Sequence, residues 1–222
     1  MKKNRVSLLL ATFALLAGNI ALAADEPPAV SHDGLALVQD SAADIAYRLP
    51  EADFSIYKRV MIMEPGVAFR KNWDRDYNRN ATRKVRESDM ERIKAGMAEL
   101  FLEVFTEDLE KAGYPVVEEV GDDVLLLRPA IINLDVTAPE LNSTGRSRAY
   151  VASAGSATLY IEFYDSVSGQ ILARAADFKK ATDWGNFQWA NGVSNRREAR
   201  IIVRKWADML VSRLNEVHGK TN

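Results

Sequence analysis

Residues 157–180 read ATLYIEFYDSVSGQILARAADFKK, and this stretch decides the fold. Its first nine residues alternate between apolar and polar side chains, with Leu159 and Ile161 on the same side, as in a strand with one buried face. Residues 166–169 (SVSG) are typical of a turn, and the residues after them return as a second strand. The pattern predicts an antiparallel hairpin with one apolar face, which needs a partner that buries it.

Two amphipathic helices are predicted, one on each side of the hairpin in the sequence. Before the first helix, residues 88–91 (SDME) have the pattern of a capping box, and apolar residues then recur at helical spacing up to residue 109. The second helix is predicted to begin at Asn195 as its cap and to carry an apolar stripe up to residue 217. Each helix therefore has one face that must be buried.

Further strands are predicted at residues 60–63 and 124–136, and Pro129 within the second favours an edge strand or a bulge. Together the elements predict an α+β fold, with an antiparallel or mixed β-sheet and the two long helices packed on one face. We expect residues 57–218 to form a single domain. Residues 24–56 are expected to be an extended linker or N-terminal arm, because proline and glycine interrupt any longer pattern.

The N-terminal residues 1–23 have the features of a secretory signal peptide. Lys2, Lys3 and Arg5 precede a short apolar core, and the segment ends in Ala-Leu-Ala at residue 23. The apolar core is too short to span a bilayer, so no transmembrane span is expected in the mature chain. The sequence has no cysteine, which excludes a lipid anchor of the kind that needs one after the cleavage site. We expect a periplasmic location.

Composition limits the classes of function. Removal of residues 1–23 leaves 26 basic and 31 acidic residues, a formal charge of −5. This mildly acidic balance argues against nucleic acid as a partner. His32 and His218 are the only histidines, and both lie near the ends of the mature chain, where chains usually fray. We therefore expect no catalytic residues, no metal site and no cofactor.

Two surfaces are candidate binding sites. Trp184, Phe187 and Trp189 lie in one polar loop, where they either staple the following helix to the sheet or form an exposed platform for an envelope protein or a glycan. Arg146 and Arg148, in a stretch rich in serine and glycine, are candidates for a charged rim. That stretch is either a flexible connection or a mobile binding loop.

The second surface is the basic segment of residues 70–86, which also contains Trp73 and Tyr77. One interpretation is a solvated loop. The other is a contact surface for an acidic partner or for phospholipid headgroups, which would allow peripheral contact with a membrane.

Three segments of the sequence resemble a known bacterial family. These are YKRVMI at 57–62, KAGY at 111–114, and the hairpin IEFYDSVSGQILA at 161–173 with Asp177 after it. They resemble the exported family catalogued as domain of unknown function 3313, over roughly residues 35–217. The resemblance implies a lipoprotein of undefined activity and no catalytic residues. This chain departs from the family pattern because it lacks the anchoring cysteine.

The sequence favours a non-enzymatic periplasmic binding or accessory protein of the bacterial cell envelope. The alternative is a carboxylate-dependent hydrolase that acts on an envelope polymer, with Asp177, Asp183 and Glu162 as its acids. Asp165 is expected to cap the turn of the hairpin instead, as aspartate commonly does at that position.

Overall fold

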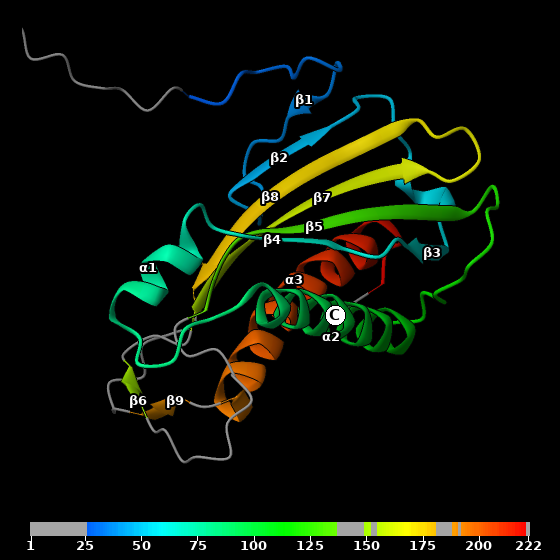
Figure 1. Cartoon of the computed structure of the whole chain (residues 1–222). Coiled ribbons are helices and arrows are strands. Elements are labelled where there is room, and N and C mark those ends of the chain that lie inside the picture. The colour runs from blue at the N-terminus through cyan, green and yellow to red at the C-terminus, as the bar shows by residue number, and fades with distance from the viewer. Residues whose placement is uncertain (1–25, 137–148, 152–154, 181–187, 191, 221–222) are drawn as a thin grey trace, which may run out of the picture.

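The part of the chain that the computed structural model describes contains a large mixed β-sheet, a separate two-stranded sheet (β6 and β9) and three α-helices (Figure 1). The described residues are 26–136, 149–151, 155–180, 188–190 and 192–220, with the backbone alone for 149–151, 188–190 and 192–195. The strands are β1 (Ala36–Leu37), β2 (Ile45–Arg48), β3 (Arg59–Ile62), β4 (Gly66–Phe69), β5 (Val124–Val136), β6 (Ala149–Val151), β7 (Gly155–Asp165), β8 (Ile171–Lys180) and β9 (Gln188–Ala190). The helices are η1 (Phe54–Ile56, a 3-10 turn), α1 (Trp73–Asn80), α2 (Glu87–Lys111) and α3 (Gly192–Val217).

Seven strands form the main sheet, in the order β1-β2-β8-β7-β5-β3, with β4 beside the far part of β5. β3 and β4 run parallel to β5, because α1 and α2 carry the chain back across the sheet between them. The other neighbours in this sheet are antiparallel. The predicted α+β class is therefore confirmed, and the sheet is mixed.

The predicted hairpin is β7 and β8. Leu159 lies opposite Asp177, and Ile161 lies opposite Ala175. Asp165 caps the turn as expected: its carboxylate accepts hydrogen bonds from the backbone N–H of Ser168 at 2.6 Å and from the Tyr57 hydroxyl at 3.0 Å.

Pro129 does not mark an edge strand, because β5 lies between β7 and the pair β3 and β4. The backbone N–H of Met63 donates to the carbonyl of Leu127, so Leu127 and, two residues on, Pro129 turn their backbone groups toward β3 and β4. At Pro129 that side faces the break between Ile62, where β3 ends, and Gly66, where β4 begins. Pro129 therefore lies in a central strand, beside the gap between β3 and β4. Its missing N–H costs no hydrogen bond between strands, because no described strand lies there to accept one.

The expected N-terminal arm contributes two strands to the sheet. β2 pairs with β8, and β1 pairs with β2. Ahead of β1, Asp33 forms an ion pair with Arg174 of β8 at 2.6 Å, and the Tyr47 hydroxyl donates to the Pro28 carbonyl at 3.0 Å. Residues 28–48 are thus bound to the sheet by backbone pairing and by side chains.

Both long helices begin earlier than predicted. α2 begins at Glu87, and the carboxylate that reaches back is Asp89, which accepts from the Arg86 N–H at 3.1 Å. The expected cap Ser88 therefore lies inside the first turn. In a capping box, the side chain three residues after the cap accepts from the backbone N–H of the cap. Here Asp89 accepts from Arg86, so the helix begins two residues earlier than a box at Ser88 would place it. α3 begins at Gly192 instead of after Asn195.

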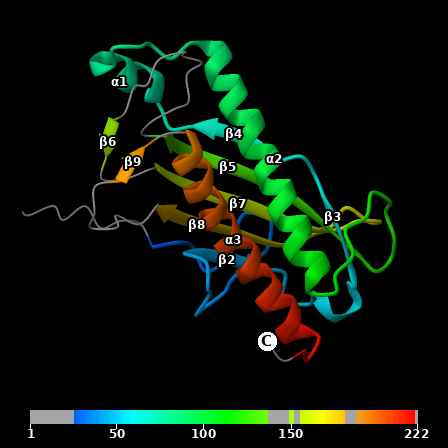
Figure 2. The same ribbon diagram turned by 90° about the horizontal axis from the view of Figure 1, so that it is seen from below.

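The two long helices pack against each other and against the sheet. Seen from below in Figure 2, α2 and α3 lie in front of the strands. Phe101 and Phe105 of α2 stack with ring centroids 4.0 Å apart, and they share one buried cluster with Ile131 of β5, Ile161 of β7 and Trp206 of α3. Alternate residues of β5 and β7 join this cluster, as the period of a strand with one buried face requires.

Candidate functional site

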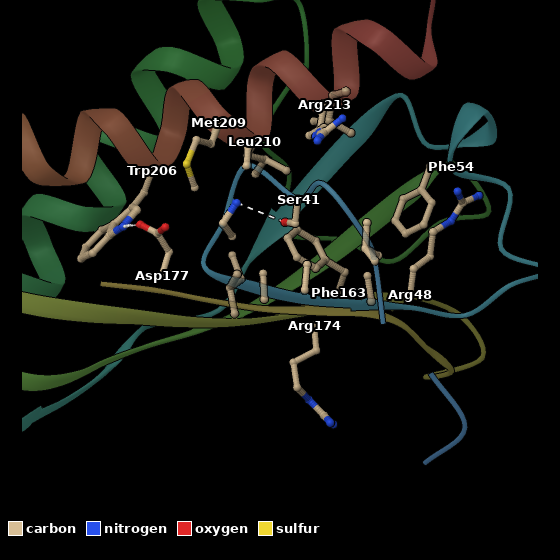
Figure 3. Close-up of a pocket in the computed structure, with 18 of the residues that line it drawn as sticks. Ser41, Arg48, Phe54, Phe163, Arg174, Asp177, Trp206, Met209, Leu210 and Arg213 are labelled. Atoms are coloured by element: carbon tan, nitrogen blue, oxygen red, sulfur yellow. Dashed lines mark hydrogen bonds between the residues drawn. The ribbon is translucent and has the colours of Figure 1, made fainter. Parts of the chain in front are cut away.

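A cavity of about 400 Å³ lies between α3 and the part of the sheet formed by β2, β8 and β7 (Figure 3). We call it the α3 cavity. Ligand sites in proteins have volumes of roughly 300–1,000 Å³, so the α3 cavity is large enough to hold a small molecule.

Alanines form the floor of the α3 cavity. Ala46 of β2 lies opposite Ala175 of β8, and Ala173 lies one step along the same side of β8. Protein interiors are normally packed to crystal-like density. Three methyl side chains under a helix leave space that larger residues would fill, and this is the physical origin of the cavity.

Helix α3 forms the roof. Trp206, Met209, Leu210 and Arg213 follow the i, i+3, i+4, i+7 spacing of one helix face, and Figure 3 shows them on the side of α3 that faces the sheet. Met209 and Leu210 are half-buried, as is Phe163 on the floor. These apolar side chains point inward but keep contact with solvent, so the α3 cavity is open to the surface.

One end of the cavity is closed by a buried carboxylate. Asp177 is 2% exposed, and it accepts hydrogen bonds from the Trp206 indole N–H at 2.8 Å and the Asp44 backbone N–H at 3.3 Å. Lys179 completes an ion pair with it. A buried carboxylate needs such partners, and here they also hold α3 to the sheet. Asp177 is therefore a positioning residue with its acceptor sites in use.

The rim of the cavity carries two guanidinium groups. Arg48 donates to the Ala52 carbonyl at 2.5 Å and lies 5.5 Å from the ring centre of Phe54. Arg213 forms an ion pair with Glu216 at 2.7 Å. Both arginines are exposed, so the rim has two positive charges and one negative charge beside an apolar interior.

A separate polar cluster lies on the opposite face of the sheet. Glu162 accepts from the hydroxyls of Tyr160 and Tyr164, each at 2.8 Å, and from Arg174 at 3.2 Å. Burial acts to raise the pKa of Glu162, but the hydrogen bonds from the two tyrosines and the charge of Arg174 hold it below its usual value. Burial and the bond to Glu162 raise the pKa of Tyr160 to about 12. Figure 3 shows Arg174 pointing away from the cavity.

These positions give the hydrolase alternative no support. Asp177 and Glu162 lie on opposite faces of the sheet, and Asp183 lies outside the described residues. Among the described residues, no group of three or more histidine, cysteine, aspartate or glutamate side chains is arranged to hold a metal ion.

The residues predicted to form the aromatic platform cannot be placed beside the α3 cavity. Trp184, Phe187, Arg146 and Arg148 lie outside the described residues. Trp189 belongs to β9, where its backbone pairs with that of Tyr150, and its side chain is outside the description. The platform therefore stays a prediction.

A family model matches residues 28–210 of the sequence, and the family has the description protein of unknown function, DUF3313. The chain belongs to the DUF3313 family. The matched residues of this DUF3313 chain include the alanine floor and, in α3, Trp206, Met209 and Leu210. A comparison of the DUF3313 chain with curated proteins found no match.

Several solved structures are similar in part to the DUF3313 chain. A PelC dodecamer from Paraburkholderia phytofirmans has 9% identity and a TM-score of 0.36, covering 74% of this chain and 96% of that chain. A DUF330 protein from Xanthomonas campestris has 8% identity and a TM-score of 0.37, with 75% and 92% covered. A minor lipoprotein from Acinetobacter baumannii has 11% identity and a TM-score of 0.30, with 72% and 94% covered. Scores this low carry no inference about the function of the DUF3313 chain.

The sequence of this DUF3313 chain did not lead us to predict the α3 cavity. The stretch ARAAD at 173–177 places Ala173, Ala175 and Asp177 on one side of a strand whose partner strand has Leu159 and Ile161 there. Small side chains at successive positions on the buried face of a strand are the available signal, because interiors are closely packed and these positions leave volume unfilled. Trp206 gives a second signal, because a buried indole N–H needs an acceptor.

Proposed function

We propose that this protein is a non-enzymatic binding protein of the bacterial envelope that holds the alkyl chain of a single-chain amphiphile in the α3 cavity. The observation that carries the proposal is the apolar cavity of about 400 Å³ between the alanine floor and α3. Burial of alkyl chain in such a site is favourable by about 0.8 kcal/mol for each CH₂ group.

The size and lining of the cavity select the kind of ligand. Its volume lies toward the lower end of the range for ligand sites, which suits one alkyl chain better than the two chains of a diacyl lipid. The charged groups lie at the edges of the cavity, with Asp177 at one end and Arg48 and Arg213 at the rim. Arg48 and Arg213 at the rim favour a head group that is anionic, such as a carboxylate.

The carboxylates at the cavity favour binding over catalysis. Asp177 is engaged by Trp206 and Lys179, and Glu216 is paired with Arg213. Neither acid is left to act on a bound molecule. A location in the envelope rests on the signal-peptide features of residues 1–23, and it is part of the proposal.

A fluorescent fatty acid tests this function directly. We expect purified protein to increase the emission of dansyl-undecanoic acid and to shift it to shorter wavelength, because the dye leaves water when its chain is bound. Ala175→Leu adds three carbon atoms to the floor and should weaken binding by about tenfold or more.

The matched control is Ala176→Leu, which makes the same change one residue along β8. Ala176 points to the other face of the sheet, so this variant should bind the fatty acid as the wild type does. Equal binding by both variants, or no saturable binding by the wild type, would rule out the α3 cavity as the site.

A further inference from the structure

A second surface, at the opposite end of the molecule from the C-terminus, is strongly basic. Residues 70–86 contain seven basic and two acidic residues, whereas the whole chain has a net charge of −2. Figure 2 shows α1, the centre of this segment, beyond one end of the sheet. The local charge is therefore opposite in sign to that of the chain as a whole.

Residues 70–86 are folded, with α1 at their centre, and this corrects the interpretation of the segment as a solvated loop. Trp73 is 1% exposed, stacks between Phe69 and Tyr77 with centroids 4.2 and 5.7 Å away, and donates its indole N–H to the Val136 carbonyl at 3.2 Å. The two aromatic residues that suggested a contact surface are thus used to anchor α1 to the sheet.

The chain after α1 is tied back to it. The side-chain oxygen of Asn78 accepts the Val85 N–H at 2.7 Å, and its nitrogen donates to the Val85 carbonyl at 3.1 Å. Val85 is buried beside Trp73. Both the helix and the following residues 81–86 are therefore held in place with their charged side chains outward.

The basic side chains of residues 70–86 divide into two groups. Arg70 is structural, because it forms ion pairs with Asp135 at 2.7 Å and with Asp76 at 2.9 Å. The other six are exposed, and we call them the α1 basic surface: Lys71, Arg75, Arg79, Arg83, Lys84 and Arg86.

Few acidic groups offset the α1 basic surface. Arg75 and Arg79 share Asp76 at 3.6 Å, and that carboxylate already accepts from Arg70. Lys71, Arg83 and Arg86 form no ion pair with any residue that the structure describes. Fixed charges held outward without partners attract anions, and clustering strengthens the attraction.

We infer that the α1 basic surface docks the protein onto a membrane that contains anionic phospholipid. The exposed cations are spread from Lys71 through α1 to Arg86, so they present their charge over an extended surface. A bilayer suits such a surface, because its headgroups rearrange laterally to meet fixed charges. Each lysine or arginine near an anionic leaflet adds a similar increment to binding.

Vesicle co-sedimentation tests the inference with the full chain. We expect binding to vesicles of phosphatidylcholine with phosphatidylglycerol, little binding to phosphatidylcholine alone, and release by high salt. The triple variant Lys71→Gln, Arg83→Gln, Arg86→Gln removes three charges without removing an ion pair among the described residues. It should lose about a hundredfold in affinity for the anionic vesicles.

The control makes the same change of net charge elsewhere, with Lys111→Gln, Arg197→Gln and Lys205→Gln, all of which are exposed. This variant should keep most of the wild-type affinity, and far-UV circular dichroism should show both variants folded. Equal losses in the two triple variants, or equal binding to neutral vesicles, would overturn the inference. Binding to polyglutamate without binding to the anionic vesicles would also overturn it and would assign the surface to an acidic polymer instead. Ala175→Leu should not change vesicle binding, which separates this surface from the α3 cavity.

Discussion

The contact between Trp206 and Asp177 links the helix to the sheet at the level of single residues. Both side chains are almost fully buried, and the indole donates to the carboxylate at 2.8 Å. A hydrogen bond to a charged group contributes more than one between neutral groups, and loss of the donor leaves part of a buried charge unsatisfied. This contact fixes the position of the roof over the α3 cavity.

Trp206→Phe removes that donor, and we expect it to lower the free energy of unfolding by about 1.5–3 kcal/mol beyond the effect of reduced side-chain volume. Trp73→Phe is the matched control. Trp73 is equally buried, but its indole donates to the neutral carbonyl of Val136 at 3.2 Å. Urea denaturation followed by circular dichroism should show a larger loss for Trp206→Phe. Equal losses would mean that the bond to Asp177 has no special role.

For single residues, the sequence predicted the role of Asp165 but not that of Asp177. The role of Asp165 as a turn cap follows from its place before the turn, because the Ser168 N–H that it caps lies only three residues further on. Asp177 was a candidate acid of the hydrolase alternative, and the sequence did not predict that it is buried. Its burial depends on Trp206, 29 residues further along the chain, and local spacing carries no information about that contact.

The segment ahead of β1 is held to the outer face of the sheet by Asp33. The hydroxyl of Ser31 and the guanidinium of Arg174 both donate to the Asp33 carboxylate, at 2.5 and 2.6 Å. These bonds, that from Ser31 foremost, lower the pKa of Asp33 from 3.8 to about 2. The ionised carboxylate therefore stabilises the fold above pH 3.8, and this contribution is lost as the pH falls toward about 2.

Asp33→Asn should therefore lose less stability than the wild type when the pH is lowered from 3.8 to about 2, as measured by urea midpoints across that window. Ser31→Ala keeps the carboxylate but removes one donor, so its pH dependence should lie between the two. Identical pH profiles for the wild type and Asp33→Asn would show that Asp33 does not tie this segment to β8.

The predicted elements succeeded where a periodic pattern extends over several turns or strand residues. The hairpin and the apolar stripe of α2 are examples, because alternation and helical spacing are local properties. Pro129 is the counterexample. Pro129 is tolerated in β5 because of the gap between β3 and β4, about sixty residues earlier in the chain. A local sequence pattern does not show which distant strand will pair with β5.

For the whole molecule, the sequence predicted the α+β class because each amphipathic element requires a partner. The α3 cavity was not predictable in the same way. It forms only because strand pairing places Ala46 beside Ala175, two residues that are far apart in the chain, and because α3 then crosses above them.

For the whole molecule, we propose two separate binding surfaces: the α3 cavity for an alkyl chain, and the α1 basic surface for an anionic membrane. No described helix is long and apolar enough to cross a bilayer. The α1 basic surface would then provide peripheral contact, and the cavity would take up an amphiphile independently of it.

Photolabelling is the most direct test of the claim that the α3 cavity binds an alkyl chain. A fatty acid with a diazirine near its chain end would be bound by the full chain, irradiated, and located by tryptic peptide mass spectrometry. We expect label in the peptide of residues 206–213, which carries Met209 and Leu210 of the roof. The label should be lost in Ala175→Leu and retained in Ala176→Leu. Label spread over peptides that do not line the cavity, and unchanged in Ala175→Leu, would show that the α3 cavity does not bind the alkyl chain.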